Sequence, residues 1–407
     1  MNEFDRELAR RLAALRDQGL LRELRRVDTP QSPRLEIAGR TLLNFSSNDY
    51  LGLANEPALK EAAIKAVEGF GAGAGASRLL CGSLAPHHEL DETLASFKGV
   101  AAALSFATGY AAAAGAIGAL LGPDDVIVLD KLVHACIVDA AHLCGAKIRV
   151  FAHNDLNDLE SILQWTADRS PKPRALIVTE SVFSMDGDHA PLREMVALKE
   201  RYGAWLMVDE AHATGLYGAN RRGLAEELGV SDGIEIQMGT LGKALGAAGG
   251  YICGSRTLVD YLINRARTFI FSTAPVPAAA AAATAGLRFV QSRLGEERRN
   301  QLWRLVAELA SNLGPQVSPP APNAPPSPLP SAIIPLLIGE ESQAVAAASG
   351  LRAQGLFVPA IRYPTVARGK ARLRVTVTAA HTQADLAQLS AALRTSDFGP
   401  SHHAPAR

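Results

Sequence analysis

The stretch Gly239-Thr240-Leu241-Gly242-Lys243-Ala244-Leu245-Gly246 places a single lysine among small residues, directly after the apolar run from Ile234 to Met238. Glycines let the backbone approach another molecule closely, so a planar group could lie over this part of the chain. The chemistry to consider first for Lys243 is an imine with a carbonyl compound. A phosphate-binding loop is excluded by the spacing and by Ala244, which stands where that motif needs Ser or Thr. Taken alone, Lys243 could also be an ordinary solvated lysine.

Length and charge bound the remaining possibilities. With 407 residues the chain should form two or three substructures. Its 41 Lys and Arg residues balance 41 Asp and Glu residues, so no overall field would attract nucleic acid or a membrane surface. We therefore expect small molecules or protein as partners, with neither nucleic acid nor membrane among them.

Cysteine usage and the N-terminus indicate the compartment. The cysteines lack paired metal-ligand spacing, so we expect no metal site and instead buried free thiols in a reducing compartment. Acidic residues near the start argue against a signal or transit peptide, and the longest apolar run is too short to span a bilayer. We expect a cytoplasmic protein. The cysteines are Cys81, Cys136, Cys144 and Cys253.

From about residue 100, helical patterns alternate with short apolar runs. This alternation predicts an α/β domain with a mostly parallel sheet, in which ligands gather beyond the carboxyl ends of the strands. The expected strands are 126–129, 148–151, 175–179, 205–208 and 234–238.

The flanking regions complete the predicted organisation. Leucines at helical spacing predict a helix over 3–26, and 315–330 is proline-rich and typical of a linker or surface loop. We expect an N-terminal helix and arm (1–45), a large cofactor-binding domain (46–290), a small α+β domain (291–396) and a disordered tail (397–407).

Two short motifs look functional by their letters alone. The glycines of 71–75 match a dinucleotide fingerprint, but a helical pattern precedes them and no helix follows, so a flexible loop is predicted instead. His87-His88-Glu89 lacks the spacing of a helix-borne metal site, and these histidines are expected on the surface.

Polar residues follow five of the predicted elements and should meet at one edge of the sheet. Lys243 would hold pyridoxal phosphate as an imine, and Asp209 would face the ring nitrogen and keep it protonated. Phosphate suits the start of a helix, where the macrodipole is favourable. In this interpretation His212 bonds the ring oxygen, His134 stacks on the ring, and Gly109, Tyr110 and Thr240 hold the phosphate.

Along nearly its whole length the chain resembles the α-oxoamine synthases, which are pyridoxal phosphate enzymes of the aspartate aminotransferase fold. The stretches that carry the resemblance are 44–53, 151–155, 182–188, 207–212, 240–243, 371–374 and 379–381. It implies fold type I, with a mostly parallel seven-stranded sheet in the large domain and a small α+β C-terminal domain.

The resemblance also implies roles for individual residues. Lys243, His134, Asp209 and His212 would be catalytic, and Ser184 would lie beside the cofactor ring. Ser272 and Thr273 resemble residues that reach the phosphate held by a partner subunit, which implies a homodimer with shared active sites. The substrate would be bound by Arg22, His134, Thr365 and Arg374.

The implied reaction is decarboxylative condensation of an amino acid with an acyl thioester. Within the family, 360–366 resembles the members of biotin synthesis, whose substrates are L-alanine and pimeloyl-CoA or a pimeloyl-acyl carrier protein. Members that use glycine, of the acetyltransferase or 5-aminolevulinate synthase type, remain the nearest alternative. A nicotinamide-dependent dehydrogenase and a noncatalytic binding protein are the alternatives from other classes.

Overall fold

The computed structural model describes residues 1–314 and 329–395. Its contacts divide the chain into two units. Of the described residues, the terminal unit comprises 1–47, 302–314 and 330–395, and the central unit comprises 48–301 with Leu329. The first 47 residues therefore group with the C-terminal part of the chain. The four domain boundaries predicted from sequence stay a prediction, and both 315–328 of the proline-rich segment and the tail 397–407 lie outside the described residues.

The central unit is built on a seven-stranded sheet of order β3-β9-β8-β7-β6-β4-β5. Only β9 pairs antiparallel with its neighbours; the other pairings are parallel, as predicted. All five strands expected from the apolar runs are present. The strands are β3 (Ala102–Phe106), β4 (Val126–Asp130), β5 (Lys147–Phe151), β6 (Ala175–Glu180), β7 (Trp205–Asp209), β8 (Ile236–Thr240) and β9 (Gly250–Gly254).

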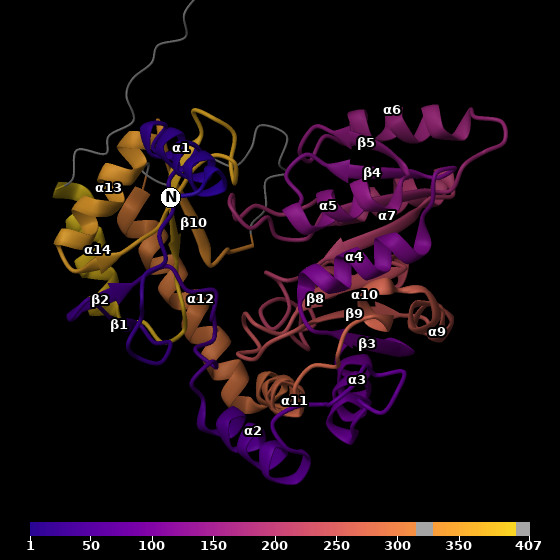
Figure 1. Cartoon of the computed structure of the whole chain (residues 1–407), viewed down its shortest axis with the longest axis horizontal. Helices are drawn as coiled ribbons and strands as arrows, with labels where there is room; N and C mark the ends of the chain where they lie inside the picture. Colours follow the sequence, from indigo (N-terminus) through magenta and orange to yellow (C-terminus); the bar gives the residue numbers. More distant parts are fainter. Residues whose placement is uncertain (315–328, 396–407) are drawn as a thin grey trace, which may run out of the picture. The chain divides into compact units, whose positions relative to one another are not determined.

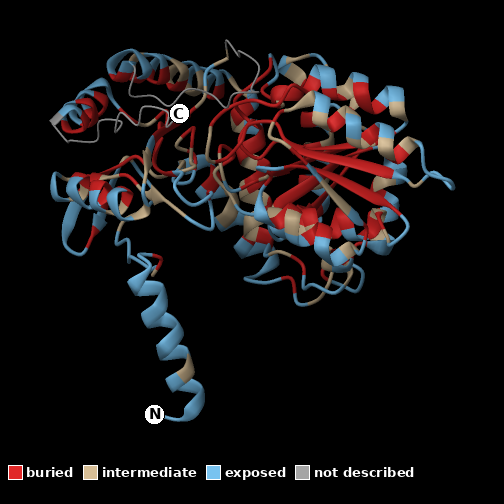
Figure 2. Cartoon of the chain, turned by 90° about the horizontal axis from the view of Figure 1, so that it is seen from above, coloured by how far each residue is buried: buried red, intermediate tan, exposed pale blue. Residues whose placement is uncertain are grey.

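Helices surround this sheet, and its strands are buried except for the edge strand β5, which is largely accessible (Figures 1 and 2). Strands covered on both faces become continuous apolar runs, which is why β4 reads Val-Ile-Val-Leu-Asp without alternation. The helices of the central unit are α2 (Pro57–Phe70), α3 (Ala85–Lys98), α4 (Gly109–Leu120), α5 (Ala135–Cys144), α6 (Leu156–Ala167), α7 (Leu192–Tyr202), α8 (Leu224–Glu227), α9 (Arg256–Arg265), α10 (Arg267–Ile270) and α11 (Pro277–Gln291), with most of α12 (Arg293–Leu313) belonging to the terminal unit.

The terminal unit contains two small three-stranded sheets, of order β1-β2-β11 and β10-β13-β12. They confirm the expected mixture of helices and strands near the C-terminus. The elements are α1 (Glu3–Asp17), β1 (Arg34–Ile37), β2 (Arg40–Asn44), β10 (Ile333–Gly339), α13 (Glu341–Ala353), β11 (Leu356–Phe357), β12 (Ala360–Ile361), β13 (Ala371–Thr376) and α14 (Gln383–Thr395).

The first helix is shorter than its leucine spacing predicted. It ends at Asp17, and Gly19 follows with a positive φ of 66°, a conformation that glycine adopts readily at helix ends. None of its residues is buried (Figure 2). The leucine pattern therefore marks an amphipathic helix whose apolar side is not covered within the terminal unit.

Two surface expectations were partly wrong. His87 is fully buried in α3, where Nδ1 accepts a hydrogen bond from Leu84 N (3.1 Å) and Nε2 donates to Pro275 O (2.7 Å). His88 is exposed, as expected. The cysteines are free, but Cys81 is exposed and only Cys136 and Cys253 are buried. In both cases contacts distant in sequence decided burial, and local polarity does not encode them.

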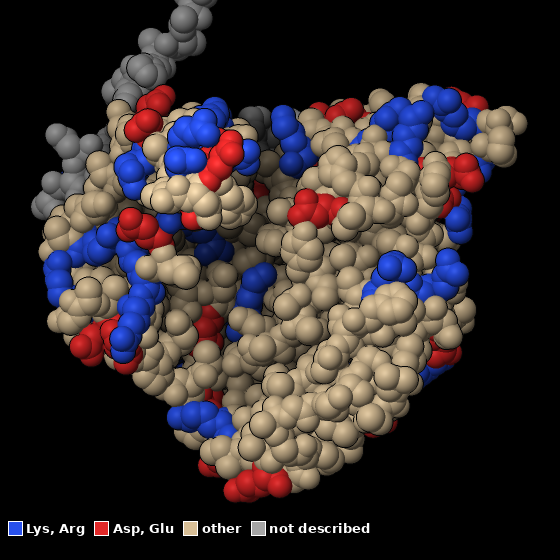
Figure 3. Space-filling view, viewed as in Figure 1, with Lys and Arg blue, Asp and Glu red and all other residues tan. Residues whose placement is uncertain are grey.

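Charges of both signs are interspersed on the face seen in Figure 3, in keeping with the balanced composition. Among residues 1–314 and 329–395, no helix combines the length and the apolar character needed to cross a bilayer.

Candidate active site

The carboxyl ends of neighbouring strands in the central unit bring the predicted Asp209 together with a second acid, Glu180. Asp209 ends β7 and lies opposite Glu180, which ends β6. Both carboxyl groups are buried, and Asp209 Oδ1 accepts a hydrogen bond from Ala211 N (2.9 Å). This edge of the sheet therefore holds two carboxyl groups side by side.

Burial raises the pKa of Asp209, and Lys243 opposes that shift most strongly. Burial also raises the pKa of Glu180 well above its usual value, with Asp209 adding to the shift and Lys243 opposing it. An opposite charge favours ionisation and a like charge disfavours it. Because Lys243 lowers the pKa of both acids, its ammonium group interacts electrostatically with the pair.

Lys243 lies in the turn after β8, as predicted from the glycine-rich stretch. Its carbonyl accepts a hydrogen bond from Gly246 N (2.9 Å). Gly246 has a φ of 68°, and a Cβ there would come within 2.5 Å of the Leu53 backbone. A glycine is needed to close this turn, which explains why small residues surround the lysine.

His134 caps the N-terminus of α5. Its Nδ1 accepts a hydrogen bond from Cys136 N (3.2 Å), which leaves Nε2 as the protonated nitrogen of the neutral ring. Burial by the surrounding protein lowers the pKa of His134; Asp209 opposes this shift and Lys243 reinforces it. A neutral imidazole with a free Nε2–H can stack on an aromatic ring and donate a hydrogen bond.

A cradle forms where β8 meets the start of α4. Thr240 Oγ1 is buried and has no hydrogen-bond partner among the described residues. A Cβ added to Gly109 would come within 2.5 Å of Thr240 Cγ2, so glycine permits this close approach. Thr108 caps α4 by accepting a hydrogen bond from Ala111 N (3.0 Å). An unsatisfied hydroxyl beside a helix N-terminus fits a phosphate group.

The remaining predicted residues of the central unit have defined partners. His212 Nδ1 lies 2.5 Å from the hydroxyl of Tyr50. Ser184 is buried, and its backbone N–H donates to Glu180 Oε2 (3.2 Å). Tyr110 is exposed and its hydroxyl donates to Asp139, a hydrogen bond that raises the pKa of Tyr110.

Three predicted substrate residues lie in the terminal unit. Arg374 is buried in β13, and its Nη1 donates to Thr376 Oγ1 (2.9 Å). Arg22 and Thr365 line a cavity of about 490 Å³ within this unit.

Four arginines line that same cavity, Arg22, Arg25, Arg352 and Arg362, and none of them forms an ion pair with any described residue. Burial lowers the pKa of Arg362, and Arg22 and Arg25 lower it further. The cavity therefore favours an anion.

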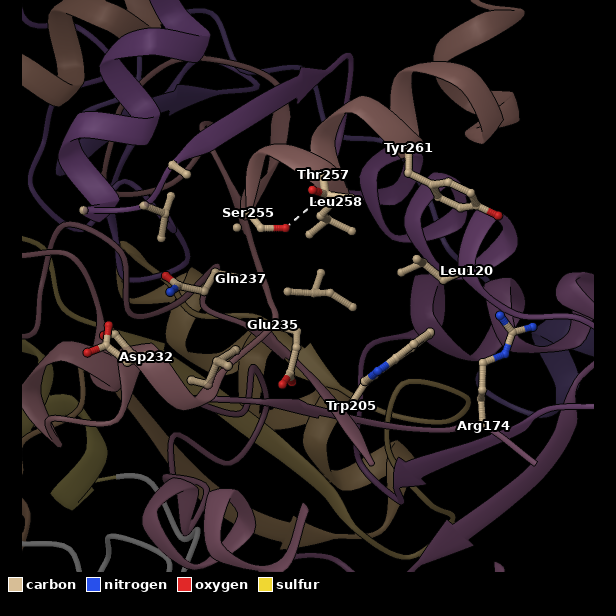
Figure 4. Close-up of a pocket in the computed structure, with 17 residues that line it drawn as sticks. Leu120, Arg174, Trp205, Asp232, Glu235, Gln237, Ser255, Thr257, Leu258 and Tyr261 are labelled. Carbon is tan, nitrogen blue, oxygen red and sulfur yellow. Dashed lines mark hydrogen bonds between the residues drawn. The ribbon is translucent and has the colours of Figure 1, made fainter. Parts of the chain in front are cut away.

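A larger cavity, of about 690 Å³, lies elsewhere in the central unit (Figure 4). Leu120, Trp205, Leu258 and Tyr261 lie around it. Two of its lining residues, Trp205 and Ile236, are the first residues of β7 and β8. The cavity is thus at the amino ends of the strands, away from Asp209 and Thr240, and none of the predicted site residues lines it.

The residues at the carboxyl edge fit pyridoxal 5'-phosphate. A lysine, a buried acid, a neutral histidine and an unsatisfied threonine beside a helix N-terminus match the imine, ring nitrogen, ring face and phosphate in turn. Together with the mostly parallel seven-stranded sheet, this set defines a pyridoxal phosphate-dependent enzyme of fold type I.

Comparisons with known proteins agree. Residues 40–393 match the family described as aminotransferase class I and II. An 8-amino-7-oxononanoate synthase of Anaeromyxobacter dehalogenans is 47% identical over 382 residues, covering 94% of this chain and 93% of its own. The chain belongs to the aminotransferase class I and II family, which confirms the fold and the resemblance recognised from the sequence.

Solved structures give the same fold. A serine palmitoyltransferase of S. paucimobilis with bound pyridoxal phosphate has a TM-score of 0.88 at 30% identity, covering 97% of this chain and 99% of that one. An 8-amino-7-oxononanoate synthase of Francisella tularensis has a TM-score of 0.73 at 25% identity, covering 87% and 96%. The family and these neighbours confirm the expectation of pyridoxal phosphate.

The sequence did not predict several residues that contact or accompany the predicted site residues. Tyr50 bonds His212 and Asp139 bonds Tyr110, and Arg25 and Arg352 join Arg22 at the arginine-lined cavity. Tyr50 stands in a stretch that carried the family resemblance, which was a usable signal. The arginines carried none, since most surface arginines are simply solvated.

Proposed function

We propose that this chain condenses L-alanine with a pimeloyl thioester. The products would be 8-amino-7-oxononanoate, carbon dioxide and the free thiol, with one proton consumed from solvent. The curated relatives carry the name of this synthase, and the enzyme is an acyltransferase. When bound, pyridoxal phosphate supplies an electron sink that stabilises negative charge at the α-carbon of the amino acid.

The predicted site residues of the central unit would each have a defined role. Asp209, in its ionised form, would hold a positive charge at the ring nitrogen, and His212 would orient the ring through its oxygen. Gly109, Tyr110 and Thr240 would hold the phosphate. The Lys243 amine would move the α-proton, and His134 would donate from Nε2–H to the thioester carbonyl. Ser184 would lie against the ring.

The terminal unit would contribute substrate recognition. Arg374 presents a rigid guanidinium fork that can bind a carboxylate bidentately. Pimeloyl thioesters carry a second, distal carboxylate, and the cavity lined by Arg22, Arg25, Arg352, Arg362 and Thr365 has the charge to recognise an acidic acyl chain.

The observation that carries the proposal is the position of Asp209 at the end of β7, between Glu180 at the end of β6 and strand β8, which leads into the turn of Lys243. A serine-using synthase is the second candidate, because serine palmitoyltransferases are close structural neighbours. The higher identity to 8-amino-7-oxononanoate synthases, 47% against 30%, favours alanine and pimeloyl substrates.

Product formation tests the proposal directly. The cofactor-loaded protein is incubated with pimeloyl-CoA and, separately, with L-alanine, glycine or L-serine, and products are identified by mass spectrometry. We expect condensation with L-alanine. Product only with serine or glycine would replace the proposed substrate and assign the chain to another activity of the family.

Replacing Lys243 provides the matching test of mechanism. Lys243→Ala should lower turnover below detection while leaving the unfolding temperature within a few degrees, because the side chain is a reacting group. Lys60→Ala is a suitable control, since Lys60 lies on exposed α2 surface and bonds only Asn55. Normal turnover in Lys243→Ala would refute the role assigned to this lysine.

We further propose that the protein is a homodimer, with Ser272 and Thr273 reaching the partner's phosphate site, and that it acts in the cytoplasm. Both residues are exposed in the single chain, after α10. The four free cysteines suit a reducing compartment.

A further inference from the structure

Glu180 is a buried acid that the proposed mechanism does not use. It is 2% exposed at the end of β6, directly opposite Asp209. Its Oε2 accepts a hydrogen bond from Ser184 N at 3.2 Å. Its Oε1 is buried with no hydrogen-bond partner among the described residues. A buried carboxyl group is costly unless its oxygens are satisfied, so this one requires an explanation.

Glu180 interacts with two other segments of the site. One is the turn after β6 that carries Ser184, through the N–H group already described. The other is the segment after β4 that carries His134, whose backbone N–H opposes the rise in the pKa of Glu180 without forming a hydrogen bond with it. The carboxyl group of Glu180 is therefore bonded to the turn of Ser184.

The charge of Glu180 matters for Asp209. Two ionised carboxylates on adjacent strand ends would repel one another in a buried setting. Asp209 must be ionised to hold a positive charge at the ring nitrogen, and Lys243 favours its ionisation. A neutral Glu180 leaves Asp209 as the one negative charge of the pair, and burial favours that neutral form.

We propose that Glu180 is a positioning residue that works in its protonated form, fixing the turn of Ser184 against the cofactor and leaving the negative charge to Asp209. This inference rests on pyridoxal phosphate binding at Lys243. The proton on Glu180 occupies one carboxyl oxygen, and the other accepts from Ser184 N–H. Gln has nearly the same shape as the neutral acid and also carries one donor and one acceptor group.

The test is equilibrium binding of pyridoxal phosphate to the apoenzyme, followed by a pH titration of the bound cofactor's absorbance. Glu180→Gln should keep the dissociation constant within about threefold of wild type and leave the absorbance transition at the same pH. Glu180→Ala should weaken binding about tenfold, because Ser184 N–H loses its acceptor. Glu235→Gln, which changes an acid at the amino end of β8 where it pairs with Lys199, is the matched control and should change neither quantity.

The two Glu180 variants distinguish a neutral positioning residue from a charged one and from a purely structural one. A large loss of affinity in Glu180→Gln, with a shifted absorbance transition, would show that Glu180 acts as a charge and overturn the proposal. Equal affinity in Glu180→Ala and wild type, with only a lower unfolding temperature, would reduce Glu180 to a structural residue and also overturn it. Failure of the wild-type apoenzyme to bind pyridoxal phosphate would instead refute the proposed function.

Discussion

At the scale of single residues, the site combines groups that the folded protein leaves with unusual properties. The pKa of Asp209 is raised, that of His134 is lowered, and the Thr240 hydroxyl has no hydrogen-bond partner in the described part of the chain. Each of these features destabilises the unliganded protein slightly, and that free energy would be recovered when a phosphorylated, positively charged ring binds at the edge of the sheet. Perturbed groups at one strand edge are therefore better explained by a ligand than by stability.

Thr240 offers a prediction in which stability and binding change in opposite directions. Thr240→Val removes a buried hydroxyl that bonds none of the described residues, so the unfolding temperature of the apoenzyme should stay equal or rise. The affinity for pyridoxal phosphate should fall about tenfold, since a phosphate hydrogen bond is lost. Calorimetry of the apoenzyme and cofactor titration measure the two effects. Thr240→Ser, which keeps the hydroxyl, is the control and should bind normally.

At the scale of elements, His153 connects the segments that follow three strands. Its Nδ1 bonds Asp130 at the end of β4, its Nε2 bonds Asp188 after β6, and both distances are 2.9 Å. Burial alone would lower the pKa of His153, but the hydrogen bonds to the two carboxylates outweigh it and raise the pKa to about 10. The imidazolium therefore holds the carboxyl edge of the sheet together over the physiological pH range.

His153→Gln should destabilise the protein by roughly 3–5 kcal/mol, the usual cost of breaking a buried ion pair. Because the folded pKa is raised, the stabilisation is complete below the unfolded value near 6.5 and is lost as pH rises towards about 10. Urea unfolding at pH 6 and pH 9.5 measures this. The difference between variant and wild type should be larger at pH 6; an equal difference at both values would contradict the charge argument. His142→Gln, on exposed α5 surface, is the control.

The arginine-lined cavity beside α13 makes a second prediction at this scale. Arg352 has a buried Nε that bonds no residue within 1–314 or 329–395, and the pKa of Arg352 is lowered by burial and by Arg25. Arg352→Gln should raise the KM for pimeloyl-CoA about tenfold, with a smaller change in kcat, because a charge-assisted contact is lost. Heptanoyl-CoA lacks the distal carboxylate and should show no such difference. A similar loss for both thioesters would argue against carboxylate recognition there.

At the scale of the whole molecule, the proposed dimer makes each active site dependent on two chains. If Lys243 acts in one subunit and Thr273 in the other, Lys243→Ala and Thr273→Ala should each be inactive or strongly impaired as homodimers. Mixing them under conditions that exchange subunits should restore activity to about a quarter of wild type, since half of the dimers are hybrids and each hybrid has one intact site.

The control for this experiment mixes Lys243→Ala with Asp209→Asn. Both changes fall on the same chain's set of groups in the central unit, so each subunit of the hybrid carries one damaged site and no site is intact. This mixture should recover nothing. Absence of recovery in the Thr273 pair, as in the Asp209 pair, would show that Thr273 serves its own subunit.

The sequence by itself determined the alternation of strands and helices and the family, and it predicted the edge of the sheet where chemistry would gather and Asp209, His134, Thr240 and Lys243 as its candidate residues. These follow from local periodicity, strand-end positions and family motifs, which are written over short distances along the chain. The tertiary structure alone decided that His87 is buried, that Glu180 lies opposite Asp209 and that four arginines face one cavity. Glu180 and Asp209 are 29 positions apart in the sequence, and Arg22 and Arg362 are about 340 apart. Burial and electrostatic coupling between such residues exist only once the fold brings them together.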